Sequence, residues 1–253
     1  MFKITKQTKF LLLGVSVISG ISFLIAYIYY DGKNKAEDPR ILKSKYFFQE
    51  YEDLVKENNF DEALSVLDSI DTIFNRVPGY KTSYEPGIVL NNRGTAYLSK
   101  ALYKTTDSLE KNIFLSFAKK NLDSCIVLYT NWLTKNEKLL KNELLNNEKP
   151  NFLMSDPAFK DRNYNIILNK RIDDLILARH ETPRRLSVTY TNLVIVLRHQ
   201  YKQNEAVECY IKAIKLWKEN YTARNNFNVL MGKPPEDRSI IDQLFPPEKN
   251  NFN

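Results

Sequence analysis

The sequence predicts an all-α protein in which a single N-terminal transmembrane helix is followed by a solenoid of helical repeats. Glycine is scarce, with 7 residues in 253, and the alternation of apolar and polar residues that is typical of strands is weak. Residues 10–30 carry no charge. Further along, apolar residues recur about every 3.6 positions in segments separated by short polar turns. With 43% hydrophobic residues, the chain can form one domain with a core or a short solenoid.

Residues 1–31 are predicted to form the membrane anchor. The uncharged stretch has 21 residues, which at about 1.5 Å each cross a ~30 Å hydrocarbon core. Tyr27, Tyr29 and Tyr30 stand where an interfacial aromatic belt would lie. A cleaved signal peptide would have a shorter apolar region and a small-x-small cleavage site, and a buried core helix would rarely be so uniformly apolar. We therefore prefer an uncleaved anchor to both alternatives.

The charges that flank this stretch predict its orientation by a narrow margin. Three basic residues precede it and three follow it: Lys3, Lys6, Lys9, Lys33, Lys35 and Arg40. Because the two sides are equal, only the N-terminal amine favours a cytoplasmic N-terminus. This predicts a single-pass membrane protein whose soluble domain is extracytoplasmic, which means periplasmic if the cell is bacterial.

Charge and cysteine content argue against two classes of protein. The formal net charge is +7, and residues 1–31 contribute +2 of it through three Lys and one Asp, which leaves +5. A surplus of this size does not require nucleic acid as a partner, and basic residues are not interleaved with aromatic ones. Two cysteines, Cys125 and Cys209, do not make a disulfide framework. We expect both to be buried or half-buried thiols.

After the anchor, polar residues 32–40 are expected to form a short linker, and residues 41–232 a helical domain. The first repeat covers residues 44–78 and is stopped by Pro78-Gly79. Its two helices carry apolar stripes: Phe47, Tyr51 and Leu54 on the first; Phe60, Ala63, Leu67 and Ile70 on the second.

The second repeat covers residues 87–130 and contains an insertion. Leu90, Gly94 and Tyr97 lie on its first helix, where Gly94 would let two helices approach closely, and Ala118, Leu122 and Cys125 lie on its partner. From Tyr97 to Ala118 is 21 positions, whereas from Leu54 to Ala63 is 9. Lengthened helices or a loop near residues 105–108 would hold the 12 extra residues.

Residues 134–182 form an irregular helical segment with no clean repeat. We expect one helix over residues 132–147, a stretch broken by Pro150 and Pro157, and another helix over residues 165–180. Pro183 then opens the last repeat, residues 187–220, and a capping helix follows over residues 221–232. The tail, residues 233–253, holds four apolar residues between prolines: Ile240, Ile241, Leu244 and Phe245. We expect this cluster to fold back onto its own domain, and a docking motif is the alternative.

Residues 187–220 resemble the tetratricopeptide repeat. The matching residues are Tyr190, Leu193, Val194, Leu197, Ala206 and Tyr210, with Val194 in place of the family glycine, Leu197 in place of the family tyrosine, and no closing proline. The repeat around Gly94 keeps the glycine and, in Tyr97, the tyrosine. The resemblance implies antiparallel helix pairs that stack around a concave groove, and it implies protein partners.

Four amide side chains occupy the same place on successive first helices: Gln49, Asn92, Asn192 and Asn226. In tetratricopeptide proteins that bind extended peptides, an asparagine at this place commonly contacts the ligand backbone, and an amide suits a peptide unit because it donates and accepts at once. Asn91, Arg198 and His199 are expected to share the groove. The alternative is that these amides only satisfy groups of neighbouring helices.

A basic patch around Pro183 contains Arg179, Arg184 and Arg185. It could meet acidic lipid or a phosphorylated partner. The alternative is a solvated helix end, where Arg179 would suit the helix C-terminus.

The sequence offers no catalytic or metal-binding pattern. The two histidines have no spacing that suits a metal, and neither a phosphate-binding glycine loop nor a Gly-x-Ser-x-Gly motif occurs. We therefore predict that the protein is no enzyme and has no metal, cofactor or small-molecule substrate. We expect a membrane-anchored scaffold that binds other proteins or extended peptide segments through its concave groove. The alternatives are a structural subunit of a larger envelope complex, and a membrane-anchored transport or import receptor.

Overall fold

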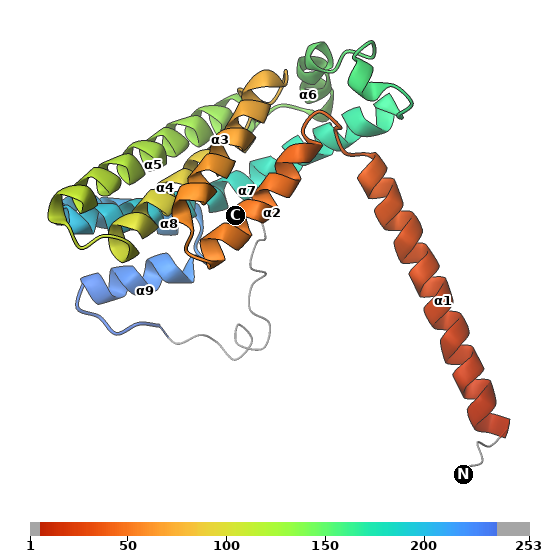
Figure 1. The fold of residues 1–253 in the computed structure, drawn as a ribbon, viewed down its shortest axis with the longest axis horizontal. Coiled ribbons are helices and arrows are strands. Elements are labelled where there is room, and N and C mark those ends of the chain that lie inside the picture. Colours follow the sequence, from red (N-terminus) through yellow and green to blue (C-terminus); the bar gives the residue numbers. More distant parts are fainter. Residues whose placement is uncertain (1–5, 237–253) are drawn as a thin grey trace.

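The computed structural model describes residues 6–236, and over this range the protein is all-α, with no strand (Figure 1). The α-helices are α1 (Lys6–Lys35), α2 (Leu42–Lys56), α3 (Phe60–Arg76), α4 (Glu85–Tyr103), α5 (Ser108–Asn136), α6 (Lys141–Glu148), α7 (Tyr164–His199), α8 (Gln203–Leu216) and α9 (Tyr221–Leu230). Two short 3-10 helices, η1 (Lys149–Asn151) and η2 (Pro157–Phe159), lie between α6 and α7. The tail cluster predicted over residues 240–245 lies outside the described residues.

Three helical hairpins, α2–α3, α4–α5 and α7–α8, pack in series. Turns of three or four residues join the helices of each pair, so the two helices run antiparallel and lie side by side (Figure 1). Between hairpins, α3 packs on α4, α5 on α7, and α8 on α9. This order of contacts is the one expected when each hairpin adds to the end of the last.

The first helices α2, α7 and α9 end in the same kind of turn. The second residue past the end of each helix has left-handed backbone: Asn58 (φ 57°), Tyr201 (φ 59°) and Gly232 (φ 71°). The next amide N–H then donates back to a carbonyl of the last helical turn: Asn59 to Leu54 at 2.8 Å, Lys202 to Leu197 at 2.9 Å and Lys233 to Asn228 at 2.8 Å. These bonds satisfy carbonyls that the helix end would otherwise leave unpaired.

The apolar stripes expected from the sequence form the core. The buried members are Tyr51, Phe60, Ala63, Leu67, Ile70, Ala118, Leu122, Cys125, Leu193, Val194, Leu197, Ala206 and Tyr210. The close approach expected at Gly94 is also present, since a Cβ atom there would lie 2.7 Å from Leu122 Cγ. The 12 extra residues of the second repeat lengthen α4 and α5 rather than form a long loop, because the turn between them covers only residues 104–107.

The predicted helix break at Pro183 is wrong. Helix α7 runs for 36 residues with Pro183 inside it, so the irregular segment and the last repeat share one helix. Proline removes its own N–H from the helical ladder and its ring crowds the carbonyl four residues earlier, which costs about 3 kcal/mol. The preceding Thr182 is buried, and its hydroxyl donates to the Ala178 carbonyl at 2.6 Å. Packing on both sides of the proline keeps the helix continuous: the first half contacts α6 and the second half contacts α8.

Two further boundaries differ from the prediction. The helix expected over residues 132–147 is divided, because α5 ends at Asn136 and α6 begins at Lys141. The linker expected over residues 32–40 is no free tether: α1 continues to Lys35, and Ala36 and Asp38 are buried. Helix α1 therefore leaves the array of hairpins as a rod with a fixed base (Figure 1).

In the part of the chain that the structure describes, no helix combines the length and the apolar character needed to cross a lipid bilayer.

Candidate functional site

The amides expected in the groove on α4 and α7 lie against each other. Asn192 Nδ2 donates to Thr95 Oγ1 at 3.1 Å and to Asn91 Oδ1 at 3.4 Å. The Thr189 hydroxyl lies 3.1 Å from Asn91 Oδ1. We call these four residues together with Asn92 the α4–α7 seam. The sequence analysis gave as an alternative that the amides only satisfy groups of neighbouring helices. Asn192 Nδ2 does so, because it donates to two side chains of α4.

Asn92 differs from the rest of the seam because its amide is not fully used. The side chain is buried, and its Nδ2 has no hydrogen-bond partner. On its other side, Asn92 Oδ1 lies 3.5 Å from Asn91 Nδ2, and the Asn92 backbone carbonyl accepts from the Tyr51 hydroxyl of α2 at 3.2 Å. A buried donor left unpaired costs about 1–3 kcal/mol. The position therefore favours any hydrogen-bond acceptor that can reach it.

The two outer amides do not join the seam. Gln49 is exposed on α2, where its Nε2 donates to Asp53 of the same helix at 3.3 Å. Asn226 is half-buried on α9. Of the four predicted amides, only Asn192 makes a hydrogen bond between α7 and α4, and Asn92 lies next to its partner Asn91.

Arg198 and His199 are exposed at the last turn of α7. Partial burial lowers the pKa of His199, and the neighbouring charges of Lys111 and Arg198 lower it further. His199 is therefore neutral at pH 7 and presents one ring nitrogen as a donor and the other as an acceptor.

The predicted basic patch is divided between different elements. Arg184 pairs with Glu181 at 3.2 Å and its guanidinium lies 4.8 Å from the Trp217 ring centroid, next to the end of α8. Arg185 instead lies 5.2 Å from the Tyr84 ring centroid, next to the start of α4. Arg179 has two buried nitrogens, Nε and Nη2, without a hydrogen-bond partner. Arg184 and Arg185 consequently do not form one surface.

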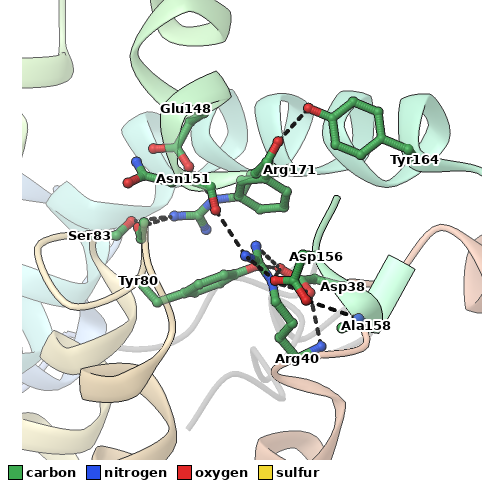
Figure 2. Close-up of polar contacts among 12 residues, drawn as sticks. Asp38, Arg40, Tyr80, Ser83, Glu148, Asn151, Asp156, Ala158, Tyr164 and Arg171 are labelled. Atoms are coloured by element: carbon green, nitrogen blue, oxygen red, sulfur yellow. Dashed lines mark hydrogen bonds and ion pairs between the residues drawn. The ribbon is translucent and has the colours of Figure 1, made fainter. Parts of the chain in front are cut away.

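A buried ionic cluster that the sequence analysis missed lies at the other end of α7 (Figure 2). The Arg171 guanidinium is paired with Glu85 and with Glu148 Oε2 at 3.3 Å. It also donates to Ser83 Oγ and to the Gly79 carbonyl, both at 2.9 Å, and it lies 4.2 Å from the Tyr80 ring centroid. The only signal in the sequence was an arginine within the apolar stripe of a helix.

The cluster continues through Tyr80 to the base of α1. The Tyr80 hydroxyl donates to Asp38 Oδ2 at 3.1 Å, and Asp38 pairs with Arg40 at 2.8 Å. Arg40 also donates to the Asn151 carbonyl at 2.9 Å and packs on two aromatic rings of the segment between α6 and α7 (Figure 2). We call Asp38, Arg40, Tyr80, Glu85, Glu148 and Arg171 the junction cluster, because it fixes the base of α1 to α4, α6 and α7.

The two cysteine thiols of the core are buried rather than activated. Burial raises the pKa of the Cys125 thiol to about 12, and burial also raises the pKa of Cys209, so both stay protonated at pH 7. Both cysteines are free and buried. Within residues 6–236, no group of His, Cys, Asp and Glu side chains could hold a metal ion.

A scan against protein-family profiles gives no match to this chain, and a search of curated proteins finds no significant relative.

Proposed function

We propose that the protein is a membrane-anchored, tetratricopeptide-like scaffold that binds an extended segment of another protein along the α4–α7 seam. The observation that carries this proposal is the unpaired amide donor of Asn92, next to Asn91, which is itself paired with Asn192. Backbone carbonyls of an extended peptide are acceptors that suit such a donor, and recognition through amides reads the peptide backbone rather than its side chains.

The peptide would bind in two steps: the Asn92 side chain first changes its rotamer, and the peptide then bonds to it. Asn92 Nδ2 is covered in the unbound protein, so its side chain must change rotamer before a peptide carbonyl can reach it. Asn192 uses its Nδ2 within the seam, which leaves its Oδ1 to accept from a peptide N–H. Gln49 and His199, both exposed, would extend the contact beyond the two ends of the seam.

Photo-crosslinking from cells tests where the partner lies. A photoreactive amino acid in place of Gln49 or His199 is expected to capture a partner protein. The same amino acid in place of Asn75 or Asn112, which are exposed on the second helices α3 and α5, serves as the control and should not. Capture from the second helices alone would contradict binding at the seam and would favour the alternative of a structural subunit.

The membrane part of the proposal is supported by the exposure of α1. Leu11, Ile18, Phe23 and Tyr27 each have more than 60% of their surface exposed, and residues 10–30 carry no charge. Exposed apolar area costs about 25 cal/mol per Å² in water, and a continuous apolar surface of this size marks a membrane or protein contact. We propose that lipid covers it.

Extraction with alkaline carbonate tests this anchor. The full chain is expected to stay in the membrane pellet, whereas a chain that lacks residues 1–31 is expected in the supernatant. Release of the full chain would contradict the anchor. Protease treatment of intact cells then tests the orientation, since an extracytoplasmic domain is cleaved once the outer barrier is opened and a cytoplasmic one is not.

A further inference from the structure

The open end of the array carries an apolar groove between α8 and α9. Its floor is formed by Ile211, Ile214 and Phe227, and its volume is about 500 Å³. Ile211 has 52% of its surface exposed although it lies in the middle of α8. The first helices α2, α4 and α7 each pack against the second helix of their own hairpin. Among the described residues, no second helix follows α9 and packs against it.

The rim of this groove is basic. Lys215, Lys218 and Arg224 surround the apolar floor. Arg224 Nε is buried and has no hydrogen-bond partner among the described residues. The occupant of the groove should therefore combine an apolar face with acidic or other acceptor groups.

The chain leaves the described structure at this same rim. The Glu236 carboxylate pairs with Arg224 Nη2 at 3.1 Å, and the Glu236 backbone N–H donates to Asn225 Oδ1 at 2.7 Å. Residues 233–236 thus run back along α9 and bring the start of the tail to the groove. The three residues that follow Glu236 span up to about 10 Å when extended, and they start beside Arg224, which itself lines the groove.

The tail sequence matches the groove in pattern, length and charge. Ile240, Ile241, Leu244 and Phe245 fall on one face of a helix. Ser239, followed three residues later by Asp242, is a helix-start signature, and Pro246 ends the helix. Six helical residues span about 9 Å, close to the length of α8 that lines the groove. Asp237 and Asp242 complement the basic rim.

From these observations, we infer that residues 239–245 form a short helix that docks in the groove between α8 and α9. The docked helix acts as the second helix of a fourth hairpin and closes the open end of the array. A helix this short is unstable alone in water, so its formation and its docking are one event.

A proximity test uses the full chain with Cys209→Ala, in which the remaining native thiol, Cys125, is buried. The pair Ile211→Cys and Leu244→Cys is expected to form a disulfide within one chain under mild oxidation, at least ten times faster than the control pair Ile211→Cys and Asn251→Cys. Equal rates for the two pairs, or a disulfide that joins two chains and speeds up with protein concentration, would overturn the proposal.

A second measurement does not depend on engineered thiols. Trypsin cleavage after Arg238 is followed by mass spectrometry in the full chain, where docking should protect the site. The double change Ile241→Asp and Leu244→Asp is expected to speed cleavage at least tenfold, whereas the matched change Asn250→Asp and Asn251→Asp beyond the prolines should not. Equal cleavage in all three chains would show that the tail does not occupy the groove. Helix content by circular dichroism should be nearly the same in all three, because the changes lie outside residues 6–236.

Discussion

The junction cluster and the α4–α7 seam are both buried polar regions between helices, but they treat their polar groups differently. The junction cluster places Arg171 among two carboxylates, a hydroxyl and a carbonyl, and only Glu85 Oε2 among its buried side-chain atoms has no hydrogen-bond partner. The seam is made of neutral groups and leaves Asn92 Nδ2 unpaired. A charge must be paired when it is buried, because its desolvation is expensive, whereas an unpaired neutral amide costs less, about 1–3 kcal/mol. We propose that the charged region fixes geometry and that the neutral one receives a partner.

The largest effect should come from breaking the charge pairing at the junction. Arg171→Met leaves Glu85 and Glu148 buried without their partner, so we expect the free energy of unfolding to fall by about 3–5 kcal/mol. Urea denaturation of the full chain in mild detergent measures this. Arg162→Met, at an exposed arginine, is the control and should change it by less than about 0.5 kcal/mol. Equal effects at both positions would remove the distinction between junction and surface.

A smaller loss is expected at the bond that joins the two halves of the cluster. Tyr80→Phe removes the hydroxyl that donates to Asp38 and keeps the ring beneath Arg171, so we expect a loss of about 1.5–3 kcal/mol. Tyr46→Phe, on an exposed ring of α2, should be neutral in the same urea titration. If Tyr80→Phe is equally neutral, the base of α1 is not held by this bond.

A substitution in the seam should weaken partner binding and leave stability nearly unchanged, whereas one in the junction lowers stability. Asn92→Ala removes a donor that makes no hydrogen bond, so its cost should stay below about 1 kcal/mol, while partner binding weakens. Asn75→Ala, at an exposed amide of α3, is the matched control for both readouts. A loss of stability as large as that of Arg171→Met would mean that Asn92 is a structural residue.

The pH dependence of stability gives the smallest and most specific effect. Burial raises the pKa of Glu148, and Arg171 opposes this only in part. A carboxyl with a raised pKa in the folded state adds stability below its unfolded pKa, and this contribution is lost as pH rises through the folded pKa. Relative to the parent chain, Glu148→Gln should therefore gain stability as pH rises from about 4 to 7. A constant difference across that range would contradict the raised pKa.

The hairpins could be predicted from the sequence because their signal is local. Stripes such as Ala206 and Tyr210 recur at helical spacing, and a turn of a few residues forces two neighbouring helices to be antiparallel. The continuity of α7 could not be predicted, because Pro183 is a local break signal that packing on both sides overrides.

The junction cluster was beyond reach for a different reason. Arg40 lies 111 residues from Asn151 along the chain, and Arg171 lies 86 residues from Glu85. No local periodicity encodes such pairs, so residues 32–40 resembled a solvated linker. For the seam, the sequence predicted that Asn91, Asn92 and Asn192 share one groove but did not show that only one of their amides is left unpaired.

The most direct test of the binding proposal measures affinity at the seam. The partner segment captured by photo-crosslinking is synthesised, and its dissociation constant is measured for the full chain, for Asn92→Ala and for Asn75→Ala. We expect Asn92→Ala to weaken binding about tenfold, as the loss of one hydrogen bond of about 1.4 kcal/mol requires, with Asn75→Ala unchanged. The same dissociation constant for all three chains would contradict the claim that the unpaired Asn92 amide receives the peptide.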